Sequence, residues 1–361
     1  MTDARAQRLA LLIDGLTAAH LDGLLLTSLP NIRYLTGFSG TSALVFVSPR
    51  ETVLITDFRY QTQVAAEVSD RVRVVIEAQS LWTGLWHLLA HANVAVIGFE
   101  SAHLQHRDFQ RLLEQGSRYQ WRPTLDLVET LRERKDEEEV ALIARAAEVA
   151  CTALAAVLPQ VHVGMSEFAV AGVLEKALRD AGSEDFPFPS IVASGERAAL
   201  PHARSSSRRI RDGDFLLLDY GAVVEGYCSD VTRTVVVGTA SLEQREIYEV
   251  VRTANERAAA AVRPGMTGRD ADAVARGYIE QCGYGELFGH SLGHGIGLEV
   301  HEAPRLARSA EGPLVDGTVV TIEPGIYRPG WGGVRIEDDV HLTREGPRIL
   351  TPFTRDLVEL R

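Results

Sequence analysis

The stretch DFLLLDYGAVVEGYCSDVTRTVVVG, residues 214–238, contains two β-rich runs on either side of Glu225-Gly226. A two-residue connection of this kind predicts a β-hairpin. Its register places Asp219 opposite Thr232. Side chains two residues apart on a strand point to the same face, so Asp230, two residues before Thr232, is a diagonal neighbour of Asp219 on one face. The residues before Asp219 are apolar, and an unpartnered buried carboxylate is costly, so the pattern indicates a cation between the two aspartates.

Two further acids lie at the end of, or within, apolar strands later in the chain. TVVTIEPGIY ends a predicted strand on Glu323, and GGVRIEDDV places Glu337 inside another. Each acid taken alone is more simply explained as a solvated side chain or half of an ion pair, because most charged residues are exposed. Together with Asp219, Asp230 and one histidine, they make an oxygen-rich set that suits a pair of divalent ions better than a single zinc ion.

The histidine comes from FGHSLGHGIGLEVHE, residues 288–302, which combines three histidines with four glycines. His290 and His294 are four apart, as in the zinc-binding HExxH signature, but each glycine costs about 1 kcal/mol inside a helix. Ser291 also replaces the glutamate of that signature. A dinucleotide-binding loop is excluded because the G-x-G-x-x-G spacing is missing. We therefore predict irregular, closely packed backbone that carries histidines.

The composition of the 361-residue chain narrows the class of protein further. Its 37 basic and 49 acidic residues give a net charge of −12, which argues against a nucleic-acid partner. The three cysteines have no CxxC spacing, so they indicate neither a disulfide framework nor a thiolate metal site and favour a reducing, cytoplasmic location. The first residues do not read as a secretory signal, and no apolar run approaches the roughly 18 residues that span a bilayer, so no membrane partner is expected.

The chain is long enough for two domains, and we place their boundary at about residue 125. In residues 1–125, predicted strands at 23–26, 43–47, 52–55, 72–76 and 94–98 alternate with predicted helices at 4–19, 59–68 and 105–115. This alternation predicts a compact α/β domain. Residues 126–361 begin with a long helix, for which Asp136 and Glu139 predict the start and Pro159 the end.

The second domain contains a weak internal repeat. Val161–Gly182 aligns without gaps on Val262–Gly283, and Ser166 and Thr267 then occupy the same helix-cap position. Two unrelated helical units that share favourable turn residues would explain this match. The alternative is a pseudo-twofold α+β domain whose site lies between its halves.

Four sequence motifs in this domain resemble those of a known protein family. LDYGxxxxGYxSDxTRT, HxxGHGIGLExHE, TIEPGIY and GGVRIED occur in this order and resemble the motifs of metal-dependent Xaa-Pro peptidases, the prolidase and aminopeptidase P group of the pita-bread, methionine-aminopeptidase-like family. The resemblance implies an α+β pita-bread catalytic domain after a smaller, creatinase-like α/β domain. It also implies two divalent metal ions, Mn²⁺ ahead of Co²⁺ or Zn²⁺. The implied ligands are Asp219, Asp230, His294, Glu323 and Glu337.

The resemblance implies a role for each remaining candidate as well. His202, in LPHARSS, and His301 would donate hydrogen bonds to the developing oxyanion, and Glu323 would also carry a proton. Without the resemblance, His202 would be interpreted as an ordinary loop residue. The expected substrate contacts are His290 in the wall of the proline pocket, Arg305 at a dipeptide carboxylate, and Tyr327 and Arg335.

The implied activity is hydrolysis of the bond that precedes proline in small peptides with proline at the second position. Arg305 favours an Xaa-Pro dipeptidase, and the alternative is an aminopeptidase P that acts on longer peptides. A metal-free peptide-binding protein on the same fold is a third class, which the intact ligand set opposes. We also expect a homodimer.

Overall fold

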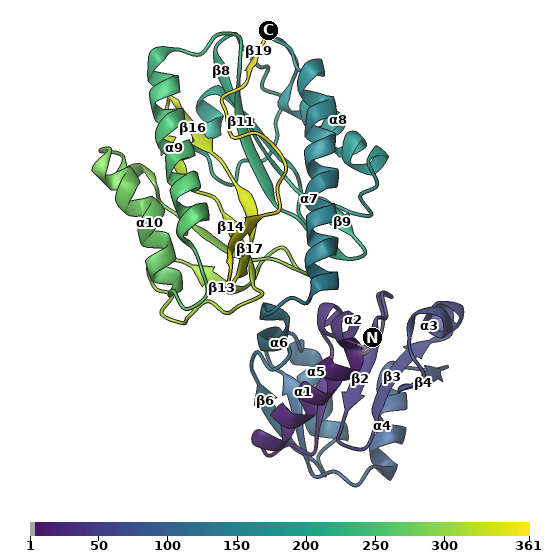
Figure 1. Cartoon of the computed structure of the whole chain (residues 1–361). Helices are drawn as coiled ribbons and strands as arrows, with labels where there is room; N and C mark the ends of the chain where they lie inside the picture. Colours follow the sequence, from purple (N-terminus) through teal and green to yellow (C-terminus); the bar gives the residue numbers. More distant parts are fainter. Residues whose placement is uncertain (1–3) are drawn as a thin grey trace. The chain divides into compact units, whose positions relative to one another are not determined.

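The computed structural model describes residues 4–361, which divide into two compact units (Figure 1). The first ends at Arg132 and the second begins at Glu133. The sequence predicts the boundary at about residue 125, and the short helix α6, Glu129–Glu133, begins in the first unit.

The first unit is a six-stranded sheet with helices, in the strand order β4-β3-β2-β1-β5-β6. The α/β prediction for it is confirmed. Its strands are β1 Gly23–Leu26, β2 Leu44–Val47, β3 Thr52–Asp57, β4 Val72–Glu77, β5 Val96–Glu100 and β6 Gln120–Thr124. Its helices are α1 Ala4–Ala18, α2 Leu29–Thr36, α3 Gln61–Glu67, α4 Leu81–His91 and α5 His106–Gln115.

The sequence did not predict α2, α4 or β6. Each contains a residue that weakens the local signal: Pro30 in α2, Gly84 in α4 and Pro123 in β6. Proline is tolerated in the first helical turn and on an edge strand, and β6 is the edge of this sheet. Tertiary packing therefore decides these three elements.

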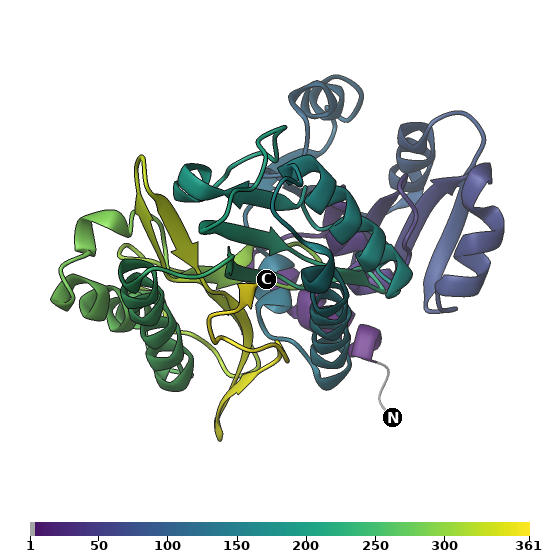
Figure 2. The same cartoon turned by 90° about the horizontal axis from the view of Figure 1, so that it is seen from above.

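The second unit carries two larger sheets between four long helices (Figures 1 and 2). One sheet has the order β19-β11-β8-β7, and the other has the order β13-β12-β14-β17-β18. The strands of the first are β7 Ile191–Ser194, β8 Asp214–Tyr220, β11 Val231–Val237 and β19 Glu359–Leu360. Those of the second are β12 Gly293–Gly295, β13 Glu302–Leu306, β14 Val319–Ile322, β17 Asp338–Thr343 and β18 Gly346–Ile349. Two short hairpins pair β9 Val223–Val224 with β10 Tyr227–Cys228, and β15 Gly325–Arg328 with β16 Gly332–Arg335.

The four helices pack on both faces of β8. They are α7 Glu137–Val157, α8 Glu167–Asp180, α9 Leu242–Ala261 and α10 Gly268–Gln281. Leu216 and Leu218 belong to the apolar core formed with α7 and α8, whereas Phe215 and Leu217 belong to the core formed with α9 and α10. A strand that is buried on both faces explains the continuous apolar run before Asp219.

The predicted hairpin register is confirmed. Thr232 pairs with Asp219, and Glu225 and Gly226 have φ values of 46° and 75°, as a two-residue hairpin turn of type I′ requires. The prediction of two continuous runs is wrong, because β8 ends before β9 begins and Ser229-Asp230 separates β10 from β11. The N–H group of Asp230 leaves the ladder and donates to Asp339 Oδ2 at 3.1 Å.

The predicted start of the long helix is confirmed by a capping box at α7. Asp136 Oδ1 accepts from Glu139 N at 2.9 Å, and Glu139 Oε2 accepts from Asp136 N at 3.1 Å. Contrary to the sequence analysis, one helical segment, Glu137–Gln160, is long and apolar enough to span a bilayer, with a hydropathy of 1.8. Half of its apolar window is buried inside the unit, and it supplies much of the core around α8.

The internal repeat is a structural one. Ser166 and Thr267 cap α8 and α10 in the same way, with the side-chain oxygen accepting from the backbone N–H three residues later. The preceding Gly164 and Gly265 have φ values of 92° and 90°. Each cap residue also forms an isolated bridge to a later segment, Ser166 to Arg209 and Thr267 to Pro313. Common turn chemistry alone does not predict these matching bridges.

Candidate metal centre

The fold brings the five predicted ligands to the ends of strands from both halves of the second unit. Asp219 lies in β8, Asp230 lies between β10 and β11, His294 lies in β12, Glu323 follows β14, and Glu337 lies between β16 and β17. The placement of Glu337 inside a strand is wrong, because β16 ends at Arg335 and β17 begins at Asp338. In the β14–β17 register Ile322 pairs with Asp338, so Glu323 and Glu337 leave the sheet at the same end.

Three of these side chains form a compact donor cluster. Ligand atoms of Asp230, His294 and Glu337 lie within 4.8 Å of one another. His294 Nε2 is 3.4 Å from Glu323 Oε1 and 3.8 Å from Asp230 Oδ2. The imidazole therefore points one ring nitrogen toward two carboxylates.

The hydrogen bond on the other side of the His294 ring shows which nitrogen carries the proton. His294 Nδ1 lies 3.0 Å from Gly295 O, and a carbonyl oxygen can only accept, so Nδ1 is the donor. Burial lowers the pKa of His294 to about 4, which leaves the ring neutral and Nε2 unprotonated at neutral pH. The lone pair of Nε2 thus faces carboxylate oxygens, and a cation between them resolves the repulsion.

The acids also need a counter-charge. Burial, followed by the charges of neighbouring acids, raises the pKa of Asp230 and Glu337 well above the usual range, and burial raises the pKa of Glu323 to about 8. Within residues 4–361, Oδ1 of Asp219 and Oδ1 of Asp230 are buried without a hydrogen-bond partner. These orphaned oxygens and the free Nε2 of His294 fit bound divalent cations.

The glycines around His294 serve strand packing. Gly293–Gly295 is the three-residue strand β12, which corrects the prediction of wholly irregular backbone. A Cβ atom at Gly293 would lie 2.0 Å from Thr321 O, and one at Gly295 would lie 2.0 Å from Ala303 O. Both positions therefore admit only glycine, which lets β12 fit between its neighbours and fixes His294 at the centre.

Arg335 links three of the predicted site residues. Its Nη2 donates to Asp219 Oδ2 at 2.5 Å, and its Nη1 donates to the Tyr327 hydroxyl at 2.8 Å. That hydroxyl lies 2.9 Å from Nε2 of His290, whose Nδ1 lies 2.8 Å from Ser291 O. Since Nδ1 donates to the carbonyl, Nε2 accepts, and Tyr327 passes a hydrogen bond from Arg335 on to His290.

The three remaining predicted residues lie on the exposed side of the centre. The rings of His301 and His294 have centroids 4.4 Å apart, and Arg305 is the β13 residue opposite His294. His202 follows Pro201, whose carbonyl accepts from Arg335 Nη1 at 3.3 Å. Burial lowers the pKa of His301, and the nearby Arg305 and His202 lower it further. These three side chains therefore lie in one region.

Three residues that the sequence analysis did not assign to the site support its ligands. Thr232 Oγ1 donates to Glu337 Oε2 at 2.6 Å and accepts from Arg335 Nε at 3.0 Å. Thr321 Oγ1 accepts from His294 N at 3.1 Å and lies 3.3 Å from Glu323 Oε1. The third is Asp339, which accepts from the Asp230 N–H. Thr232 could have been found, because the predicted register already placed it opposite Asp219.

The fold and the site define a protein of two compact units with a candidate metal centre rich in carboxylates. Residues 141–344 match metallopeptidase family M24, and residues 8–134 match the creatinase/prolidase N-terminal domain. The chain belongs to the M24 metallopeptidase family and has a creatinase/prolidase-type N-terminal domain.

Relatives match along nearly the whole chain. An Xaa-Pro dipeptidase of Pyrococcus horikoshii is 35% identical over 358 residues, 99% of this chain and 100% of that protein. The solved Xaa-Pro dipeptidase from Bacillus anthracis is 40% identical with a TM-score of 0.96, covering 99% of this chain and 100% of that one. The solved X-Pro aminopeptidase from Thermotoga maritima is 37% identical with a TM-score of 0.89, covering 94% and 98%.

Proposed function

We propose that this protein is an Xaa-Pro dipeptidase that uses two divalent metal ions. The observation that carries this proposal is the buried donor set, in which two aspartates have orphaned oxygens and the free nitrogen of His294 faces two carboxylates. The Xaa-Pro dipeptidases among its relatives support the assignment of the substrate.

The five predicted ligands would hold the ions, and Mn²⁺ suits the site because carboxylate oxygens outnumber nitrogen donors. When bound, such ions acidify a water molecule and polarise a peptide carbonyl. Glu323 follows β14 and lies 3.4 Å from Nε2 of His294, at the centre of the donor set, where it would take up a proton and deliver it to the proline nitrogen. His202 and His301, exposed beside the centre, donate hydrogen bonds to the carbonyl oxygen as it gains charge. Arg335 orients Asp219.

Arg305 is the feature that favours dipeptides over longer peptides. Its side chain is exposed on β13 opposite His294, where a guanidinium can bind the carboxylate of a dipeptide. The X-Pro aminopeptidase among the relatives keeps removal of Xaa from longer peptides as the second candidate.

The function is tested by comparing hydrolysis of Ala-Pro and Ala-Pro-Ala after adding Mn²⁺, Co²⁺ and Zn²⁺ separately to chelator-treated protein. We expect activity to disappear on chelation, to return best with Mn²⁺, and to favour Ala-Pro. Arg305→Met should raise KM for Ala-Pro about tenfold or more, because a charge-assisted contact is lost, and leave KM for Ala-Pro-Ala nearly unchanged. A wild-type preference for the tripeptide would establish the aminopeptidase instead. Tight metal-independent peptide binding without hydrolysis would indicate the binding protein.

Substitution of the histidines should have two different effects, on metal content or on turnover. His294→Ala is expected to reduce metal content, because its Nε2 faces the carboxylates. His202→Ala and His301→Ala should keep the metal and lower kcat about 100-fold, the usual effect of removing one oxyanion donor. Metal analysis and steady-state kinetics on the three variants check this. Loss of metal in His301→Ala would exchange the assigned roles of His294 and His301.

The sequence also suggests a setting for this activity. We propose a homodimer in the cytoplasm that acts on small peptides with proline at the second position, without a nucleic-acid or membrane partner. The net charge of −12 argues against a nucleic-acid partner, and the three cysteines without CxxC spacing favour a reducing, cytoplasmic location. Sedimentation of the full chain tests the dimer, and a particle with the mass of one chain would contradict it.

A further inference from the structure

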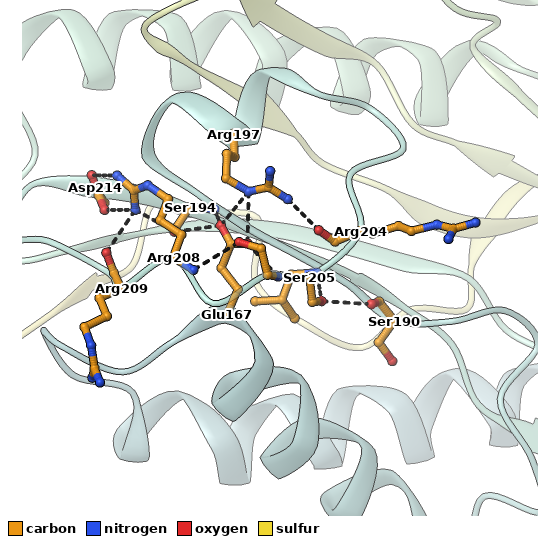
Figure 3. A network of polar contacts seen from close by, with 11 residues as sticks. Glu167, Ser190, Ser194, Arg197, Arg204, Ser205, Arg208, Arg209 and Asp214 are labelled. Carbon is orange, nitrogen blue, oxygen red and sulfur yellow. Dashed lines mark hydrogen bonds and ion pairs between the residues drawn. The ribbon is translucent and has the colours of Figure 1, made fainter.

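Glu167 is a buried acid in the first turn of α8 that has no role in the proposed mechanism (Figure 3). The residue is 0% exposed. Its Oε1 accepts from the backbone N–H and the hydroxyl of Ser194, at 2.8 and 2.9 Å. Its Oε2 accepts from the backbone N–H and the hydroxyl of Ser206, at 3.0 and 2.6 Å. Arg197 Nε, 3.0 Å from Oε2, supplies a positive charge.

These hydrogen bonds close a loop that carries His202. Ser194 ends β7 and Ser206 lies on the returning chain, so one carboxylate holds both ends of the segment 194–206. The middle of the segment is fixed separately, because Pro201 O accepts from Arg335 Nη1. His202 therefore follows a residue that contacts Arg335 and lies on a loop whose two ends are linked through Glu167.

The internal repeat shows what replaces this carboxylate in the other half. The residue aligned with Glu167 is Gly268, the first residue of α10. A Cβ atom at Gly268 would lie 2.1 Å from Arg305 O, so the start of α10 packs directly on β13, which begins just after His301. In each half the start of the repeat helix thus contacts a segment that carries an exposed histidine of the site. Backbone hydrogen bonds fix the start of the helix in both halves, from Phe168 N to Ser206 O at 3.0 Å and from Arg269 N to Ala310 O at 2.8 Å. In the first half the Glu167 side chain adds a second connection, to Ser194 at the other end of the loop.

We propose that Glu167 is a positioning residue that holds the segment 194–206 so that His202 faces the metal centre. The inference rests on the proposed function, in which His202 donates to the reacting carbonyl. A carboxylate suits the task because two oxygens can accept from donors at both ends of the loop. Hydrogen bonds to a charged acceptor are also stronger than those to a neutral one. In Glu167→Gln, one of these oxygens becomes an NH₂ group that faces other donors.

The first test does not depend on activity. Hydrogen exchange of wild-type and Glu167→Gln protein should show faster exchange of backbone amides within 195–206 in the variant. The amides of β14, which lies in the other sheet, should keep their protection, and metal content should stay equal. Unchanged exchange in 195–206 would overturn the proposal.

The second test is a double-mutant cycle with His202→Ala. Glu167→Gln should lower kcat on an Xaa-Pro dipeptide about 10- to 100-fold, because small displacements of a catalytic group have effects of this size. The same change in the His202→Ala background should have almost no effect, since the group that Glu167 positions is then missing. An equal loss in both backgrounds would overturn the proposal, because it would show that Glu167 only stabilises the fold.

Two further variants complete the design. Glu139→Gln removes a matched buried acid in the first turn of α7, where Oε1 accepts from the Tyr227 hydroxyl at 2.9 Å, and its effect should be the same in both backgrounds. If Glu167→Gln does not fold, Ser206→Ala removes one donor to Glu167 and is judged by the same two tests.

Absence of hydrolysis by wild-type protein would overturn the proposed function, while hydrogen exchange would still decide whether Glu167 holds the loop.

Discussion

Glu337→Gln is expected to lose bound metal and to lower hydrolysis of Xaa-Pro dipeptides by more than about a thousandfold. Glu337 is 2% exposed, and its Oε2 accepts from Thr232 Oγ1 at 2.6 Å, so glutamine fits the same space. The substitution removes one negative charge from a site that depends on charge to hold divalent ions. Metal analysis after purification without chelator, together with kcat/KM for Ala-Pro, measures both effects.

The midpoint of thermal unfolding should be higher in Glu337→Gln than in wild-type protein without metal, and lower than in wild-type protein with metal. Without metal, Glu337→Gln relieves repulsion among buried acids, so the midpoint should rise above that of wild-type protein. Added Mn²⁺ should raise the wild-type midpoint and have little effect on the variant, because a ligand stabilises the state that binds it. Glu243→Gln, which removes the charge of an acid paired with Arg328 at 2.8 Å, is the control and should behave as wild type. Full activity in Glu337→Gln would show that the metal centre is assigned wrongly.

Arg233→Lys is expected to destabilise the second unit by about 3–5 kcal/mol, because several buried carbonyl oxygens lose a donor at about 1–3 kcal/mol each. Arg233 is 2% exposed and pairs with Asp338 at 2.8 Å. Its remaining donors bind the carbonyl oxygens of residues on both sides of the centre and in the C-terminal segment. These acceptors are Thr232 O, Glu337 O, Phe353 O and Thr354 O.

Lysine has a single nitrogen and cannot replace this planar set of donors. Thermal unfolding should show a midpoint lower by about 10 °C, from the usual relation between free energy and midpoint for a domain of this size. Arg355→Lys is a matched control, because Arg355 binds the other oxygen of Asp338 at 2.7 Å but is 19% exposed. A midpoint for Arg233→Lys that equals the wild-type value would contradict the assignment.

The sequence predicted the structure best where residues close together in the chain determine it. The hairpin register could be derived because the residues that occupy the turn, Glu225 and Gly226, fix the pairing on both sides. The start of α7 could be derived because Asp136 and Glu139 cap it through contacts three residues apart. The candidate metal ligands were predicted from spacing and from the family resemblance together, and the fold brings their side chains to one place.

Features that depend on distant segments could not be predicted in this way. Asp230 leaves its strand because Asp339, far along the chain, accepts its N–H group. Glu337 lies outside a strand because its own N–H donates to Thr232 O. The support that Thr321 gives to His294 follows from the pairing of β12 with β14, which has no local pattern in the sequence.

The distribution of the metal ligands along the chain has a consequence for biosynthesis. The donors extend from Asp219 to Glu337, and β17 must pair with β14 before Glu323 and Glu337 meet. A ribosome releases Asp219 and Asp230 well before this pairing is possible, so the nascent chain holds only a fragment of the donor set. The complete donor set therefore forms late, and we expect divalent ions to bind tightly only after the chain has been synthesised past Glu337.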